Sequence, residues 1–186
     1  MKKLTILLTV LFSVVAILCV TYILVTFVDK DIRRATELSY DWTKEYQSFT
    51  DEICKDSSSD KEKVLAIYDW VITNISYDYD ADPMYQSIEI NRTVTTRKGI
   101  CFDFANLFTM MCRSQGIPCY SVDGYKKDDE NSLHTWNRVY YDGNWWNCDV
   151  TFDSIRLKAN KSLYGFLRLG NSVRAPDENY VVTRIY

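Results

Sequence analysis

With 186 residues, a net charge of −3 and 47% hydrophobic residues, the chain has the size and apolar content of one ordinary globular domain. Only six glycines and three prolines are present, which excludes a collagen-like or disordered chain. The acidic balance excludes the basic field typical of nucleic-acid-binding domains, so no nucleic-acid partner is expected. The only histidine is His134, so any mechanism that needs an imidazole must use this residue.

An uncharged segment occupies positions 4–28. As a helix rising about 1.5 Å per residue, it would be roughly 37 Å long, enough to cross the ~30 Å hydrocarbon core of a bilayer. A cleaved signal peptide has a shorter apolar region, of about 7–15 residues. A lipoprotein would use Cys19, but Ile17 and Leu18 precede it where small residues are expected. The segment therefore predicts an uncleaved, single-pass anchor in the lipid bilayer.

Basic residues flank the segment on both sides, with Lys2 and Lys3 before it and Lys30, Arg33 and Arg34 after it. These flanks nearly balance under the positive-inside rule. The very short N-terminal tail is typical of a signal-anchor, and this interpretation places the rest of the chain outside the cytoplasm.

After the anchor, a polar segment carries apolar and aromatic side chains at helical spacing and ends in a Ser-rich stretch. We therefore divide the chain into an anchor (1–28), a juxtamembrane helix and linker (29–57) and a domain (58–186). The sequence contains no internal repeat and gives no indication of the oligomeric state.

Two helices are predicted at the start of the domain. The first begins at Ser59, because Ser59 followed by Glu62 is a capping-box pattern. The second follows Gly99, with Cys101 in its first turn, and ends at Gly116. The apolar face expected for the first helix comprises Val64, Leu65, Tyr68, Val71, Ile72 and Ile75. The segment 76–87 between the helices has no period and is expected to be a loop.

The C-terminal half alternates strand-like segments with turn signals. Asp142-Gly143 is a hairpin turn signal, and the charged segment 126–132 is expected to be a loop. Helices followed by antiparallel strands indicate an α+β fold. Strands are expected at 119–126, 134–141, 145–152, 162–169 and 181–186.

Cys101 stands at the first turn of its predicted helix. The partial positive charge at a helix N-terminus favours a thiolate, and Arg97 and Lys98 add to this effect. A thiolate there is the usual metal-free form of a cysteine nucleophile. A free cysteine is also often buried and inert, which is the interpretation for Cys112 and Cys119.

The hairpin supplies candidate partners for this thiol. A two-residue turn at 142–143 fixes the pairing of the two strands and places Asp149 opposite Trp136, on the same face as His134. Diagonal neighbours on one face lie ~7–8 Å apart at Cα, a gap that an imidazole and a carboxylate can close. Cys101, His134 and Asp149 would then be nucleophile, base and orienting group. On spacing alone, a core histidine and a capping aspartate stay open as alternatives.

The other cysteines suggest two further arrangements. A zinc site made of Cys101, Cys112, Cys148 and His134 is disfavoured because no paired C-x₂₋₄-C spacing is present, and no metal or cofactor is expected. Cys119 and Cys148 fall in predicted strands, so a disulfide between them stays open for an oxidising compartment.

Three sequence blocks together resemble the transglutaminase-like superfamily over about residues 58–170: KGICFDFANLFTMMCRSQGIPCYSVDGY, HTWNRVYYDGNWWNCDVTFD and LYGFLRLG. The resemblance rests on a G-x-C before D-x-A-x-L, a GIP after the helix, an H-x-W and a W-x-x-D-x-T. It implies a papain-like α+β fold in which Cys101 is the nucleophile, His134 the base and Asp149 the orienting group.

The resemblance also implies acyl transfer on a peptide or protein substrate through a thioester. A cysteine hydrolase is the favoured activity, and a cross-linking transglutaminase or a non-catalytic binding module are the alternatives. The Cys101 N–H is a candidate oxyanion donor. No tryptophan precedes Cys101 closely enough to be the second donor, which leaves Tyr77, Tyr79 and Tyr85 as candidates.

Overall fold

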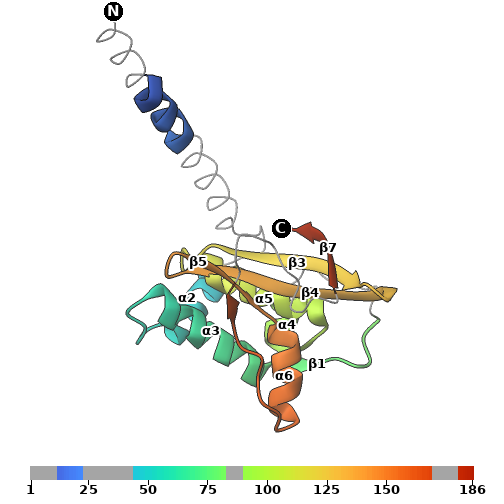
Figure 1. Cartoon of the computed structure of the whole chain (residues 1–186). Coiled ribbons are helices and arrows are strands. Elements are labelled where there is room, and N and C mark those ends of the chain that lie inside the picture. Colours follow the sequence, from blue (N-terminus) through green and yellow to red (C-terminus); the bar gives the residue numbers. More distant parts are fainter. Residues whose placement is uncertain (1–11, 23–43, 83–89, 169–179) are drawn as a thin grey trace, which may run out of the picture. The chain divides into compact units, whose positions relative to one another are not determined.

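The computed structural model describes residues 12–22, 44–82, 90–168 and 180–186 (Figure 1). Contacts divide the chain into two units, 1–34 and 35–186. In the first unit, residues 12–22 form a helix with exposed side chains. None of the helices in the described ranges is both long and apolar enough to cross a membrane. The predicted anchor at 4–28 lies only partly within the described residues.

The second unit contains helices and two sheets. The helices are α2 (Lys44–Ile53), α3 (Asp60–Asn74), α4 (Ile90–Thr96), α5 (Cys101–Ser114) and α6 (Val150–Lys158). The strands are β1 (Ser76–Tyr77), β2 (Lys98–Gly99), β3 (Cys119–Lys126), β4 (Asp129–Tyr141), β5 (Asn144–Cys148), β6 (Leu167–Arg168) and β7 (Tyr180–Ile185). The expected α+β class is confirmed.

The larger sheet is antiparallel, with the strand order β6-β5-β4-β3-β7. Strands β4 and β5 pair from Tyr141↔Asn144 to Asn137↔Cys148, which is the register that the sequence predicted. Figure 1 shows β3 and β4 passing over α5, and the contacts between these elements are extensive. Strands β1 and β2 form a separate parallel pair.

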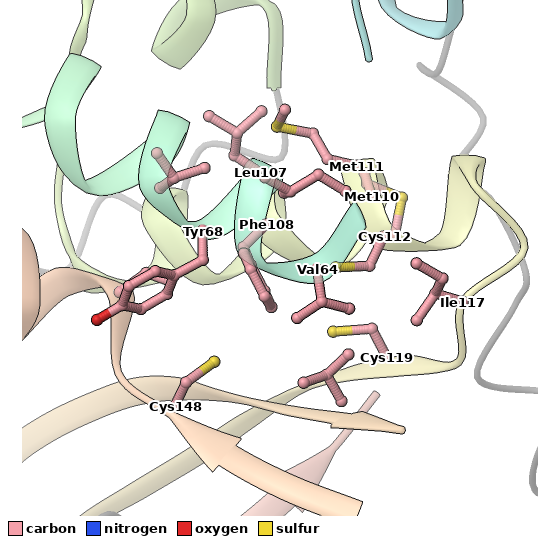
Figure 2. Close-up of a cluster of buried hydrophobic side chains, with 14 of the residues drawn as sticks. Val64, Tyr68, Leu107, Phe108, Met110, Met111, Cys112, Ile117, Cys119 and Cys148 are labelled. Atoms are coloured by element: carbon pink, nitrogen blue, oxygen red, sulfur yellow. The ribbon is translucent and has the colours of Figure 1, made fainter. Parts of the chain in front are cut away.

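The main core lies between the larger sheet and helices α3 and α5. Figure 2 shows Val64 and Tyr68 of α3 beside Phe108 of α5, with Cys119 and Cys148 of the sheet across from them. A smaller, mainly aromatic cluster lies on the other face of the larger sheet, because successive side chains along a strand point to opposite faces. It consists of Tyr120, Val122, Trp136 and Tyr180.

Helix α3 begins as predicted, with one change in its cap. The Ser59 hydroxyl accepts the Glu62 N–H, but the Glu62 carboxylate accepts from the N–H and hydroxyl of Ser58 rather than from Ser59. The predicted apolar face is wrong at Leu65, which is 36% exposed, because Ile67 fills the core instead.

Several predicted boundaries in the C-terminal half are wrong. The strand predicted at 145–152 ends at Cys148, and helix α6 follows, because the Asp149 side chain accepts the Phe152 N–H and starts a helix. Strand β4 begins at Asp129, inside the predicted loop, because it pairs with the end of β3. Helix α4 and the β1–β2 pair have no counterpart in the predictions. Cys119 and Cys148 are both free thiols.

Candidate active site

Cys101 is the first residue of α5, and the residues around it explain why the helix starts there. The Asp103 carboxylate accepts the Ile100 N–H at 2.9 Å, and the Phe104 N–H donates to the Ile100 carbonyl. A Cβ on Gly99 would lie 2.6 Å from the Asp103 Cβ, so only glycine leaves room for the Asp103 side chain to fold back onto the Ile100 N–H. The thiol is half-buried at the helix N-terminus, where the helix dipole stabilises negative charge.

His134 and Asp149 are in direct contact. His134 lies on β4, and Asp149 follows β5 one residue beyond its last pair with β4. The His134 Nε2 is 2.5 Å from the Asp149 Oδ2, and the two side chains are only 7% and 3% exposed. Because Nε2 is taken by the carboxylate, the second ring nitrogen, Nδ1, is left for another partner.

Cys101 lies close to the imidazole, and its thiol is among the groups that raise the pKa of His134. Burial alone lowers the pKa of His134, but the charge and hydrogen bond of Asp149, together with Cys101, raise it to about 10. The environment therefore stabilises an imidazolium between a carboxylate and a thiol, which is the charge state that a Cys–His nucleophile requires.

Asp149 is fixed by its position at the start of α6. Its Oδ1 accepts the Phe152 N–H at 2.9 Å, so each carboxylate oxygen has one partner. The far end of α6 is tied to α3: the Lys158 ammonium donates to the Ile72 and Ile75 carbonyls, and the Ser154 hydroxyl also donates to Ile75. These hydrogen bonds fix the position of α6. Because Asp149 caps this helix, they also keep its carboxylate facing the His134 imidazole.

Buried polar contacts set the distance between α5 and the sheet. The Asn137 amide on β4 donates to the Ala105 carbonyl at 2.8 Å and to the Thr109 hydroxyl at 3.0 Å. Thr109 also bonds the Ser121 hydroxyl on β3. Asn137 is fully buried and lies three residues from His134 on the same strand. The helix that carries the thiol is therefore fastened directly to the strand that carries the imidazole.

Aromatic rings enclose the imidazole. Phe152 stacks on His134 with ring centroids 4.4 Å apart, and Tyr180 and Trp136 lie at 5.7 and 6.2 Å. Gly124 on β3 pairs with His134 and leaves space for this cluster. A Cβ there would lie 2.6 Å from the Trp136 ring and 2.4 Å from the Val181 carbonyl. The rings keep water from the His134–Asp149 contact.

Two tyrosines are close enough to Cys101 for the charge of its thiolate to raise their pKa. Tyr77 precedes Cys101 in the sequence, and Tyr186 is the last residue of the chain. Burial raises the pKa of Tyr77, and a negative charge on Cys101 raises it further. The same two influences act on Tyr186, whose pKa is also raised by Asp123. The Tyr186 hydroxyl donates to the Asp123 carboxylate, which also accepts from Thr135.

The structure thus brings together Cys101, His134 and Asp149, and their catalytic roles stay a prediction. Sequence reasoning missed Phe152 and Tyr180. Phe152 was assigned to a strand, where alternation does not place it over the imidazole, and Tyr180 arrives through a long-range strand pairing. Within the described ranges, no group of three or more His, Cys, Asp or Glu side chains is arranged to hold a metal ion.

The family model described as "Transglutaminase-like superfamily" matches residues 47–150. Kyphoscoliosis peptidase from Mus musculus is 32% identical over 127 residues, and its human counterpart is 31% identical over the same length. The alignments cover 62% of this chain and 19% of each peptidase, so this chain spans about a fifth of their length.

Solved structures share the fold. A candidate cysteine protease from Cytophaga hutchinsonii superposes with a TM-score of 0.56 at 24% identity, over 84% of this chain and 54% of that chain. The periplasmic domain of TgpA from Pseudomonas aeruginosa gives a TM-score of 0.56 at 18% identity, over 67% of this chain and 48% of that chain. At these identities the similarity concerns the fold alone.

Proposed function

The chain belongs to the transglutaminase-like superfamily, and we propose that it is a cysteine hydrolase that cleaves amide bonds in peptides or proteins through a thioester. The observation that carries this proposal is the relay Cys101–His134–Asp149. It joins a half-buried thiol at a helix start to a buried imidazole that faces a buried carboxylate. The relatives named as peptidases support hydrolysis over cross-linking.

The proposed reaction has two halves. The Cys101 thiolate attacks the amide carbonyl, and the C–N bond breaks as the His134 imidazolium gives its proton to the departing amine. This leaves a thioester and a neutral imidazole. His134 then takes a proton from water, the hydroxide formed attacks the thioester, and the thiolate and imidazolium are restored as the acid leaves. The Asp149 carboxylate holds the imidazole in place.

Activation of the thiol is tested by alkylation. Iodoacetamide is added at pH ~6 to the unsubstituted full chain and to a His134→Ala variant, and modification of Cys101 is followed by mass spectrometry. We expect faster modification in the unsubstituted chain, since an imidazolium stabilises the thiolate at this pH. Equal rates in the two chains would overturn the proposed relay.

Hydrolysis and transamidation are separated by one assay. A glutamine-containing peptide is incubated with the full chain and a fluorescent primary amine, and both released ammonia and incorporated amine are measured. A hydrolase releases ammonia or cleaves the peptide without incorporating the amine. Amine incorporation would instead identify a transglutaminase.

We also propose that residues 4–28 anchor the chain in a membrane and that the domain lies outside the cytoplasm. The support is the length of this uncharged segment and its very short N-terminal tail. The full chain should then remain with phosphatidylcholine vesicles through an alkaline carbonate wash. Replacing Val14 and Leu18 by arginine should release it, because two charges within the segment oppose insertion.

A further inference from the structure

The proposed hydrolysis passes through a tetrahedral intermediate whose oxygen carries a negative charge. The Cys101 N–H is available to this oxygen, because the first N–H groups of a helix have no partner within the helix. A second donor on the other side of the carbonyl is usual in acyl transfer. The structure offers a hydroxyl group for this place.

Tyr77 is held beside Cys101 by the small parallel sheet. Its backbone pairs with Gly99, two residues before Cys101. On either side of this pair, the Ser76 N–H donates to the Arg97 carbonyl and the Asp78 N–H to the Gly99 carbonyl, each at 2.9 Å. The position of Tyr77 is therefore fixed by the segment that leads into the nucleophile.

The side chain of Tyr77 is also fixed. It is half-buried against the main core, and its ring lies against Tyr79 with centroids 4.9 Å apart. Its hydroxyl is close enough to Cys101 for a charge on the thiolate to raise the pKa of Tyr77. Because burial acts in the same direction, this hydroxyl stays protonated at neutral pH and remains a donor.

Within the described ranges, the Tyr77 hydroxyl has no hydrogen-bond acceptor, unlike the hydroxyls of two other shielded tyrosines. The hydroxyls of Tyr68 and Tyr186 donate to the carboxylates of Asp153 and Asp123. Among the residues that the structure describes, nothing accepts from Tyr77. A donor that is shielded, protonated and unpaired beside a nucleophile is suited to a charge that exists only during the reaction.

We propose that the Tyr77 hydroxyl is the second oxyanion donor, opposite the Cys101 N–H. This assignment rests on the proposed function and adds a catalytic residue to it. When the carbonyl carbon is attacked, the C=O electron pair moves to the oxygen, and Tyr77 donates a hydrogen bond to that oxygen without transferring its proton. When the amine leaves, the C=O bond re-forms and the hydroxyl is released.

Two reagents that react with the same thiol test this role. Acylation by p-nitrophenyl acetate passes through a tetrahedral oxyanion, whereas alkylation by iodoacetamide displaces iodide and forms none. Both rates are measured on the full chain, with p-nitrophenolate release and mass spectrometry as readouts. In Tyr77→Phe, we expect acylation to fall about 100-fold and alkylation to stay unchanged, since loss of one oxyanion donor has about this effect.

Tyr79→Phe is the matched control, because it removes the same hydroxyl oxygen from a tyrosine whose ring lies against that of Tyr77. Tyr79 itself is 76% exposed. It should leave both rates unchanged. If Tyr77→Phe acylates as fast as the control while alkylation still depends on His134, the role of Tyr77 is overturned and the relay stands. If alkylation does not depend on His134, the proposed function is overturned, and the role of Tyr77 with it. Circular dichroism checks that each variant is folded.

Discussion

Oδ2 of Asp149 lies 2.5 Å from Nε2 of His134, with both side chains almost fully buried. The same carboxylate caps α6 through its other oxygen. One side chain therefore starts a helix and orients the imidazole, so the angle at which α6 leaves the sheet determines where the carboxylate points. This dual role separates the expected effects of two substitutions.

Asp149→Asn and Asp149→Ala should differ in stability but not in reactivity. Both remove the negative charge that favours the His134 imidazolium, so both should slow alkylation of Cys101 at pH ~6, by about 10-fold or more. Asparagine still caps a helix as well as aspartate does, whereas alanine does not. The alanine variant should therefore be less stable than the asparagine variant by about 1 kcal/mol in urea unfolding. Equal stabilities would show that the cap contributes little.

The free energy of unfolding should depend on pH through His134. Its pKa is about 10 in the folded chain against 6.5 for the unperturbed side chain, so the folded state binds its proton more tightly. The resulting stabilisation is complete below pH 6.5 and is lost as the pH rises toward about 10. Urea unfolding at several pH values should show this decline in the unsubstituted chain. The decline should be weaker in Asp149→Asn, and an identical profile in the variant would contradict the coupling.

The hairpin register and the contact between His134 and Asp149 could be predicted because local chemistry determines them. A two-residue turn at Asp142-Gly143 leaves only one pairing, and the period of two along a strand then places His134 and Asp149 on one face. Helix α5 could be predicted in the same way, because Gly99 precedes and Gly116 follows a segment whose apolar residues recur at helical spacing. These features depend on neighbours in sequence.

The parts that escaped prediction depend on contacts between distant segments. The four residues after Cys148 continue a strand-like pattern, but the Asp149 cap and the contacts of Ser154 and Lys158 with the end of α3 favour a helix there. The pairing of Tyr77 with Gly99 joins segments too short to carry a strand period. Sequence patterning therefore located the thiol, the imidazole and the carboxylate and gave Tyr77 as one of three candidate donors, but it did not predict the Phe152 and Tyr180 rings around the imidazole.

Gly124→Ala should damage the site through packing. The new Cβ would lie 2.4 Å from the Val181 carbonyl and 2.6 Å from the Trp136 ring, so β7 or the indole must shift beside His134. Overpacking of this kind costs about 1–3 kcal/mol, and alkylation of Cys101 should slow as well. Gly116→Ala is the control. It has open space around it but a φ of +74°, so it should lower stability and leave the alkylation rate unchanged. Equal alkylation rates in the two variants would contradict a role for this packing in placing His134.

Labelling should distinguish Cys101 from the other cysteines of the second unit, residues 35–186. Cys54, Cys112, Cys119 and Cys148 are free thiols with at most 4% exposure, whereas Cys101 is partly exposed. Burial raises the pKa of Cys54, Cys112 and Cys148, so these thiols stay protonated and unreactive in the folded chain. In a Cys19→Ser background, iodoacetamide at pH ~6 should therefore label only Cys101. Four further labels should be added when the chain is unfolded in urea without a reductant. Only two further labels would reveal a disulfide among the buried cysteines, and early labelling of any of them would show that the core opens on the timescale of the reaction.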